Sequence, residues 1–320
     1  MIKVGVPRAM LFHQYGESWV SFLDELGLEP VVTDATTGNT VRTGTMYADN
    51  ESCLPVKVFT GHLVELRDSV DAIMVPRVIS QHKGMKACPK YLGLPDMARA
   101  LDRDLPPVLA PAMDFSDRRH RWAGDWYELA RSLGAGNADA TAAVCRLLGR
   151  LRKPVTRPPA LASGALQVGV AGHLYNLNDQ GASSGLLDRI QSMGADVLTV
   201  EQVPRHFVRR QLQTLPRKIK WDYESTIVGA VMHWDRTRAV SGIIYLSSFA
   251  CGPGSMIGAL LEDQHEREGN VPLMTITLDE HSAEGGLVTR IEAFLDMLRH
   301  AAREGQSGMR ADAGKSREGM

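Results

Sequence analysis

The apolar stretch 242–246 (GIIYL) leads, five residues later, into 251–255 (CGPGS). The first part predicts a buried β-strand, and the glycines and proline after it predict a turn into a helix. That helix is marked by apolar residues at helical spacing, namely Met256, Ile257, Leu260 and Leu261. A strand followed directly by a helix is typical of a parallel sheet covered by helices. Ligands of such sheets bind beyond the carboxyl ends of the strands, where Cys251 is placed.

The same alternation of strands and helices recurs in two halves of the chain. Predicted strands lie at residues 3–8, 29–33, 71–76 and 107–111, and again at 166–172, 196–200, 242–246 and 272–278. Residues 34–50 are predicted to form a polar loop. We therefore expect an α/β fold with two Rossmann-like parallel-sheet domains that face each other across a helical bridge. The expected boundaries are 1–115 for the N-terminal domain, 116–160 for the bridge with its proline-rich connector, 161–302 for the C-terminal domain and 303–320 for a disordered tail.

Composition excludes several classes of protein. The 320 residues are 44% hydrophobic and 23% charged with a net charge of −1, which is typical of a globular protein and gives no electrostatic case for binding nucleic acid or an anionic membrane. No apolar run is long enough to span a bilayer, and no signal peptide precedes Lys3. Four cysteines without paired spacing fit a reducing compartment, so a cytoplasmic location is expected.

Three of the four cysteines lie beside prolines and glycines in phrases that predict helix starts, namely Cys53, Cys88 and Cys251. Free N–H groups at a helix start favour the thiolate form, and thiolates bind soft metals. An iron–sulfur cluster is the leading hypothesis, with free buried thiols or a zinc site of three cysteines and one further ligand as alternatives. Cys145 lies in a plain helical run and is predicted to be a core or helix-face residue.

Other polar residues follow predicted strands at the same edge. His173 follows the strand at 166–172, and Glu280 and His281 follow the last strand; each is a candidate for proton transfer or for supporting a ligand. A loop histidine bonded to backbone is the equal alternative for His173. Lys57 and Lys90 are predicted to offset the negative charge of a cluster, whereas Lys83 and Lys86 fit a solvated basic face better.

No phosphate-binding motif is present. Neither opening strand is followed by a Gly-x-Gly-x-x-Gly phrase, and no Walker lysine motif occurs in the chain. The sequence therefore does not support nucleotide binding by this chain, although the predicted fold is of a nucleotide-binding type.

Six phrases together resemble the 2-hydroxyacyl-CoA dehydratase and activase-related family over about residues 2 to 300. They are 2–9 (IKVGVPRA), 52–57 (SCLPVK), 88–96 (CPKYLGLPD), 172–176 (GHLYN), 251–255 (CGPGS) and 277–281 (TLDEH). Members of that family are iron–sulfur subunits built from Rossmann-like domains. They receive low-potential electrons from a separate ATP-hydrolysing activator, itself an iron–sulfur protein.

The resemblance implies that Cys53, Cys88 and Cys251 ligate an oxygen-sensitive [4Fe–4S] cluster in which one iron is left without a cysteine. A double-cubane cluster is less favoured, because it needs about twice as many thiolates as this chain offers. The chain lacks the activator domain to which similar sequences are often fused, so we expect a stand-alone subunit that needs a separate activator. The substrate implied is a small molecule or an acyl-CoA thioester, reduced at the open iron.

The chain departs from the family phrases at two places. Gly254 follows the Cys-Gly-Pro phrase where an acidic residue is expected, and 280–286 (EHSAEGG) is an altered version of the last phrase. Neither change removes a cysteine, so the departures concern substrate chemistry. A dehydratase or reductase component is the first function expected, and a non-catalytic electron relay or a maturation or regulatory factor is the alternative. Whether the chain forms a homodimer or a heterodimer is left open.

Overall fold

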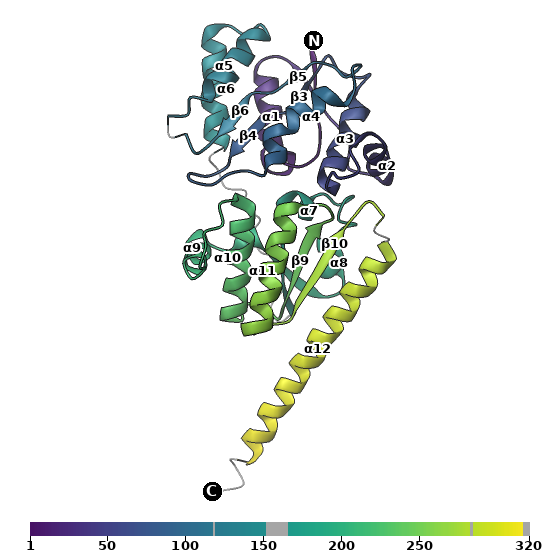
Figure 1. Ribbon diagram of the computed structural model, residues 1–320, viewed down its shortest axis with the longest axis vertical. Helices are drawn as coiled ribbons and strands as arrows, with labels where there is room; N and C mark the ends of the chain where they lie inside the picture. The colour runs from purple at the N-terminus through teal and green to yellow at the C-terminus, as the bar shows by residue number, and fades with distance from the viewer. Residues whose placement is uncertain (118, 152–165, 282–283, 316–320) are drawn as a thin grey trace.

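The computed structural model describes residues 1–117, 119–151, 166–281 and 284–315, with side chains described up to residue 304 except that of Glu284. Its main strands form two four-stranded parallel sheets, in the order β2-β1-β3-β5 and β10-β9-β7-β8. Helices pack against both, so the predicted α/β fold class is confirmed (Figure 1). We call residues 1–151 the N-terminal lobe and residues 166–315 the C-terminal lobe.

The N-terminal lobe begins with a strand and helix at the predicted places. Its elements are β1 (Lys3–Val6), α1 (Phe12–Glu25), β2 (Glu29–Val32), α2 (Gly38–Tyr47), α3 (Leu54–Leu66), β3 (Ala72–Met74), β4 (Arg77–Ser80), α4 (Pro89–Leu101), β5 (Val108–Leu109), β6 (Ala112–Asp114), α5 (Ala123–Ser132) and α6 (Asn137–Leu151). The short parallel pair β4–β6 was not predicted. It continues the direction of β3 and β5 past Pro76 and Pro111, which lack the N–H needed to keep either strand unbroken.

The C-terminal lobe repeats the plan. Its elements are β7 (Leu166–Gly172), α7 (Leu174–Asn178), α8 (Leu186–Ser192), β8 (Ala195–Thr199), the 3₁₀ turn η1 (Val200–Gln202), α9 (Arg205–Leu212), α10 (Asp222–Thr237), β9 (Gly242–Ser248), α11 (Gly252–Glu268), β10 (Leu273–Leu278) and α12 (Glu284–Lys315). All residues of β9 are buried, as the apolar stretch at its centre predicts. No described helix is long and apolar enough to cross a membrane.

The predicted polar loop at 34–50 is wrong, because its centre is helix α2. Thr37 caps the helix: its side chain accepts a hydrogen bond from the Thr40 backbone N–H, and the Thr40 side chain accepts one from the Thr37 backbone. Helix α2 packs closely on α3 through glycine, since a Cβ at Gly44 would overlap the carbonyl oxygen of Lys57. The segment is polar and has no apolar periodicity, so the sequence did not predict this helix. The helix depends on the Thr37 cap and on the close backbone contact of Gly44 with Lys57.

The helices of the predicted bridge pack onto the N-terminal lobe. Helix α6 contacts α1, and Arg146 and Arg150 of α6 both pair with Glu25 of α1. Trp126 of α5 is fully buried, with its ring edge-on to Phe22 at 5.0 Å between centroids. The bridge at 116–160 is therefore two helices of the N-terminal core, because their large apolar side chains must be buried; its proline-rich connector lies outside the described residues.

The two lobes stack on each other, with α7 at the boundary (Figure 1). Helix α7 contacts α1 of the other lobe, and one buried apolar cluster includes residues of both sheets, such as Val6 and Leu246. The carboxyl ends of β7 and β9 lead into loops at this boundary. The ligand-binding edge of the second sheet therefore faces the first lobe.

The C-terminal segment differs from the prediction of a disordered tail from residue 303. Helix α12 continues through it to Lys315, extending beyond the rest of its lobe (Figure 1). The segment contains no proline, so its backbone hydrogen bonds can form along the helix itself. A segment without apolar periodicity has no apolar face to pack on the rest of the protein. Such a segment can still be helical, which the prediction did not take into account.

Candidate functional site

Cys53, Cys88 and Cys251 are each the residue that caps the N-terminus of a helix, respectively α3, α4 and α11. A proline occupies the first or second helical position in all three. Proline is favoured there because its missing N–H would have no partner in the helix. The prediction that these phrases start helices is confirmed, and Cys145 is an exposed residue of α6 as expected for a helix-face position.

These three cysteines converge although they come from two lobes. Cys88 and Cys251 line one small hollow that is partly open to solvent. Cys53 lies close enough that a charge on it would raise the pKa of both other thiols. Because Cys53 and Cys88 belong to one lobe and Cys251 to the other, the site exists only while the lobes are packed together.

The three thiols are not the acidic thiols that their helix starts predict. Burial raises the pKa of all three and brings that of Cys251 to about 12. The backbone N–H groups of Val56, Lys90 and Gly254 act in the opposite direction but are outweighed. The expectation of thiolates from helix position alone is wrong. Burial removes water from the charged thiolate and destabilises it more than one or two backbone N–H groups stabilise it.

Gly254 makes close contact with the Cys251 thiol. Its backbone N–H donates to the Cys251 Sγ atom at 3.4 Å. A Cβ at this position would lie 3.0 Å from that Sγ and 3.1 Å from the Ser247 Oγ atom. The glycine found where an acidic residue was expected thus lets the backbone approach the sulfur without crowding.

The spacing of the cysteines distinguishes two kinds of metal site. Among the described side chains, no three His, Cys, Asp or Glu residues are grouped tightly enough to hold one metal ion. Thiolates on a zinc ion lie about 2.3 Å from the metal, so they crowd together. Each cysteine of a cubane binds a different iron and can stand further away. The three cysteines, two of which line the hollow, offer thiol donors that a cubane would use and that a zinc ion would use only with a further ligand.

His173 is buried at the carboxyl end of β7 and lines the same hollow. Its ring stacks on that of Tyr175, with 5.1 Å between centroids, and its Nε2 atom lies 3.1 Å from Glu224 Oε1. Glu224, at the start of α10, was not predicted as a site residue. In the sequence Glu224 is an acidic residue in the first turn of a helix, which is a common arrangement and gives no sign of a site. Only the packing of α10 against β7 brings it to His173.

Two of the predicted lysines lie near the cysteines. Burial raises the pKa of Cys53 and Cys88, and the charge of Lys90 acts against this rise at both thiols, as that of Lys57 does at Cys53. Lys57 is itself buried and forms an ion pair with Glu280. Lys83 and Lys86 are exposed, as expected for a solvated face.

Glu280 and His281 are placed differently from each other. Glu280 is held against Lys57 of the other lobe. His281 is exposed, and its backbone N–H donates to Asp279 Oδ1 at 2.8 Å. The structure thus brings Glu280, but not the side chain of His281, into the contacts between the lobes.

Residues 81–87 close one side of the hollow by crossing from the N-terminal to the C-terminal lobe. The Lys86 N–H donates to the Lys220 carbonyl at 2.8 Å, and the Lys86 carbonyl accepts from the Asp222 N–H at 3.2 Å. His82 Nδ1 lies 2.5 Å from Asp222 Oδ2. Since Cys88 follows this segment directly, the position of its thiol depends on these contacts between the lobes.

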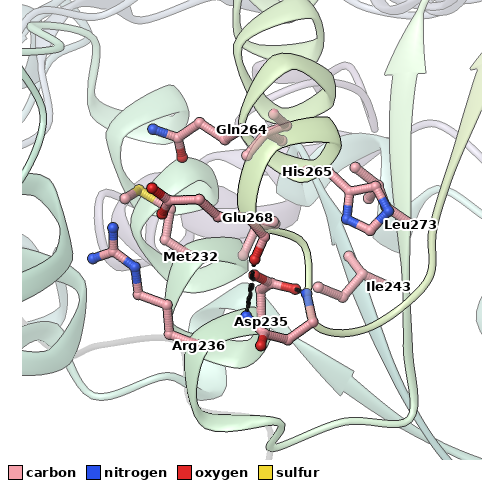
Figure 2. Close-up of a pocket in the computed structure, with 11 residues that line it drawn as sticks. Met232, Asp235, Arg236, Ile243, Gln264, His265, Glu268 and Leu273 are labelled. Carbon is pink, nitrogen blue, oxygen red and sulfur yellow. Dashed lines mark hydrogen bonds between the residues drawn. The ribbon is translucent and has the colours of Figure 1, made fainter.

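A larger surface pocket lies at the opposite end of the C-terminal sheet (Figure 2). It is lined by residues near the first positions of β9 and β10, including Ile243 and Leu273. Asp235 in this pocket accepts hydrogen bonds from the backbone N–H groups of Asn270 and Val271, which fix a turn. The pocket is far along the strands from Cys251, and its central carboxylate is used structurally.

One family model matches this chain. The model is described as the CoA enzyme activase uncharacterised domain, and it matches residues 3–203, more than half of the chain. The matched span contains Cys53, Cys88 and His173 and ends before Glu224 and Cys251. Among curated proteins, none was found to match.

Proposed function

This chain belongs to the family of the CoA enzyme activase uncharacterised domain, and on that premise we propose that it is an iron–sulfur component of an activase-type system. It accepts low-potential electrons from a partner and delivers them to a hard-to-reduce substrate of the acyl-CoA thioester class. The observation that carries the proposal is that Cys88 and Cys251, from different lobes, line one hollow, and that Cys53 lies near enough for its charge to act on both thiols.

The three cysteines are the residues that would hold a [4Fe–4S] cluster. Each thiol would release its proton to solvent as its sulfur bound iron, because a metal stabilises the thiolate far more than a helix start does. When bound, the cluster supplies one-electron transfer and, at the iron without a cysteine, Lewis acidity. Because the cysteines come from both lobes, cluster binding also fastens the lobes to each other.

Lys90 and Lys57 support a site that would carry negative charge. The charge of Lys90 already favours the thiolate forms of Cys53 and Cys88. Positive charge near a thiolate-bound cluster offsets its negative charge and raises its potential. The lysines thus make the cluster easier to reduce by an external donor.

The partner we propose is a separate ATP-hydrolysing activator that is itself an iron–sulfur protein. The sequence contains no phosphate-binding loop for ATP. The activator therefore couples ATP hydrolysis to electron transfer, and this chain receives the electron.

An electron relay is the second candidate function. The hollow is walled by the rings of Tyr91, Tyr175 and Tyr223, which leave little room for a large substrate beside a cluster. A relay passes its electron to another protein and needs no substrate pocket. Reoxidation of the reduced chain by acyl-CoA thioesters distinguishes the enzyme from the relay.

The test is anaerobic purification followed by iron, sulfide and zinc analysis. We expect about four irons and four sulfides per chain, since three thiolates suffice for a cubane with one further position. Zinc without acid-labile sulfide would overturn the proposal. With a purified activator, reduction of the cluster should require ATP, and stoichiometric ATP hydrolysis by this chain alone would contradict the two-component scheme.

A further inference from the structure

His173 and Glu224 form a fully buried pair in the wall of the hollow. Both side chains are about 3% exposed, and His173 Nε2 lies 3.1 Å from Glu224 Oε1. A carboxylate can only accept a hydrogen bond, so Nε2 carries the hydrogen. The ring is held further by stacking on Tyr175 and by edge contact with Tyr223 at 5.8 Å between centroids.

The second ring nitrogen of His173, Nδ1, is buried and has no hydrogen-bond partner among the described residues. With Nε2 protonated, a neutral ring presents a lone pair at Nδ1, and a protonated ring presents an N–H group there. Either form leaves a buried polar atom unsatisfied, which costs about 1–3 kcal/mol. A ligand in the hollow that engages Nδ1 removes this cost.

The pair has the form of a metal-binding histidine. A histidine that ligates a metal through one nitrogen commonly donates its other N–H to a carboxylate, which fixes the tautomer and the ring orientation. Here the carboxylate is on Nε2, the free nitrogen is Nδ1, and the same hollow is lined by Cys88 and Cys251.

We propose that His173 is the fourth protein ligand of the cluster, through Nδ1, and that Glu224 is the positioning residue that holds its ring. This inference rests on the proposed function, because it needs the cluster of Cys53, Cys88 and Cys251. Each lobe then contributes two ligands: Cys53 and Cys88 from the first, His173 and Cys251 from the second. An added ligand such as cyanide must displace the imidazole to reach that iron.

The test uses the full chain, loaded with its cluster and reduced anaerobically by a chemical reductant, so that no activator is needed. Pulsed electron paramagnetic resonance is recorded on protein with natural and with ¹⁵N-labelled histidine. We expect a histidine nitrogen strongly coupled to the cluster in the wild type. The coupling should disappear in His173→Cys while about four irons remain, because the new thiolate takes the vacated position. The reduction potential should fall, since histidine in place of cysteine raises it.

Glu224→Gln tests the positioning role without removing the ligand. Loss of a supporting carboxylate commonly weakens metal binding 10–100-fold, so iron should leave to a chelator faster, with the nitrogen coupling retained but altered. His300→Ala, at a histidine of α12 whose side chain is 76% exposed, should leave coupling and iron retention unchanged. A cluster without nitrogen coupling, or coupling that persists in His173→Cys, would overturn this inference alone. Wild-type protein without iron and sulfide would overturn the proposed function as well.

Discussion

Lys57 of helix α3 and Glu280, two residues past β10, form an ion pair that joins the two lobes. The Lys57 side chain is 3% exposed and that of Glu280 is 14% exposed. Burial acts to raise the pKa of Glu280, but the hydrogen bond and charge of Lys57 outweigh it and the pKa is lowered. The carboxylate therefore remains ionised and fastens the loop after β10 to the helix that begins at Cys53.

Glu280→Gln is expected to destabilise the protein more than Lys57→Met. The first change leaves a buried ammonium without its counter-charge, at a cost of about 1–3 kcal/mol. The second removes the charge and leaves Glu280, which solvent can reach. Urea unfolding of both variants and of the double variant measures the difference, and the double variant should resemble Lys57→Met.

The matched control is an ion pair on the surface. Arg267 and Asp263 of α11 pair at 2.7 Å with side chains 73% and 52% exposed. Arg267→Gln should change the unfolding free energy by less than about 1 kcal/mol, because exposed pairs contribute little. Equal effects of Glu280→Gln and Arg267→Gln would contradict the structural role of the buried pair.

Stability is expected to fall as the pH drops below about 6.5, because of a buried network between the lobes. Thr36 donates to Asp179 Oδ2 at 2.7 Å and lies 3.0 Å from His62 Nε2. Burial lowers the pKa of His62 from 6.5. The unfolded chain therefore binds a proton at His62 before the folded protein does, and acid favours unfolding.

A second loss is expected below about pH 3.8. Burial acts to raise the pKa of Asp179, but contacts from His13, Thr36 and Ala182 outweigh it and lower the pKa. The contribution of Asp179 is therefore complete above its unfolded pKa of 3.8 and is lost as the pH falls through the folded value. Unfolding free energy measured from pH 7 to pH 3 should fall in both ranges.

Thr36→Val tests the network directly. It keeps the shape of the side chain but leaves the Asp179 carboxylate without one donor, at a cost of about 1–3 kcal/mol at pH 7. The difference in unfolding free energy between the variant and the wild type should shrink as the pH falls through the folded pKa of Asp179, which lies below 3.8. A difference that is constant over the whole pH range would show that Thr36 acts by packing alone.

Gly44→Ala should separate helix α2 from α3. The added methyl group would overlap the Lys57 carbonyl oxygen, and crowding of this kind costs about 1–3 kcal/mol. Gly38→Ala is the control in the same helix, because a Cβ there has no neighbour within 4 Å. Thermal unfolding should show a lower midpoint for Gly44→Ala and an unchanged or slightly higher one for Gly38→Ala.

Single replacements of Cys53, Cys88 and Cys251 by Ala should each remove or destabilise the proposed cluster. Each thiol is one of three, so no other cysteine can take its place. Cys145→Ala, at an exposed position of α6, should keep the iron and sulfide content of the wild type. Equal loss in all four variants would show that the cluster is held by other residues.

The fold class could be predicted because its signals are local. The apolar strands before Gly172 and Ser248, and the prolines and glycines after Cys53, Cys88 and Cys251, produce strand and helix boundaries through neighbouring residues alone. Helix α2 could not be predicted in this way, since its polar sequence is stabilised by a cap at Thr37 and by contact with α3. The helices at 123–151 were found as helices, but their place on α1 depends on partners more than a hundred residues away.

The sequence by itself determined the candidate residues for the proposed chemistry: three cysteines at helix starts, a histidine after a strand, and lysines beside two of the cysteines. Only the tertiary structure decided what surrounds them. Packing of the lobes brings Cys53, Cys88 and Cys251 together, sets Glu224 on His173 and joins Lys57 to Glu280. It also removes water from the thiols, which raises each pKa although the helix starts act to lower it. A helix start is a property of adjacent residues, whereas burial is a property of the whole packed chain.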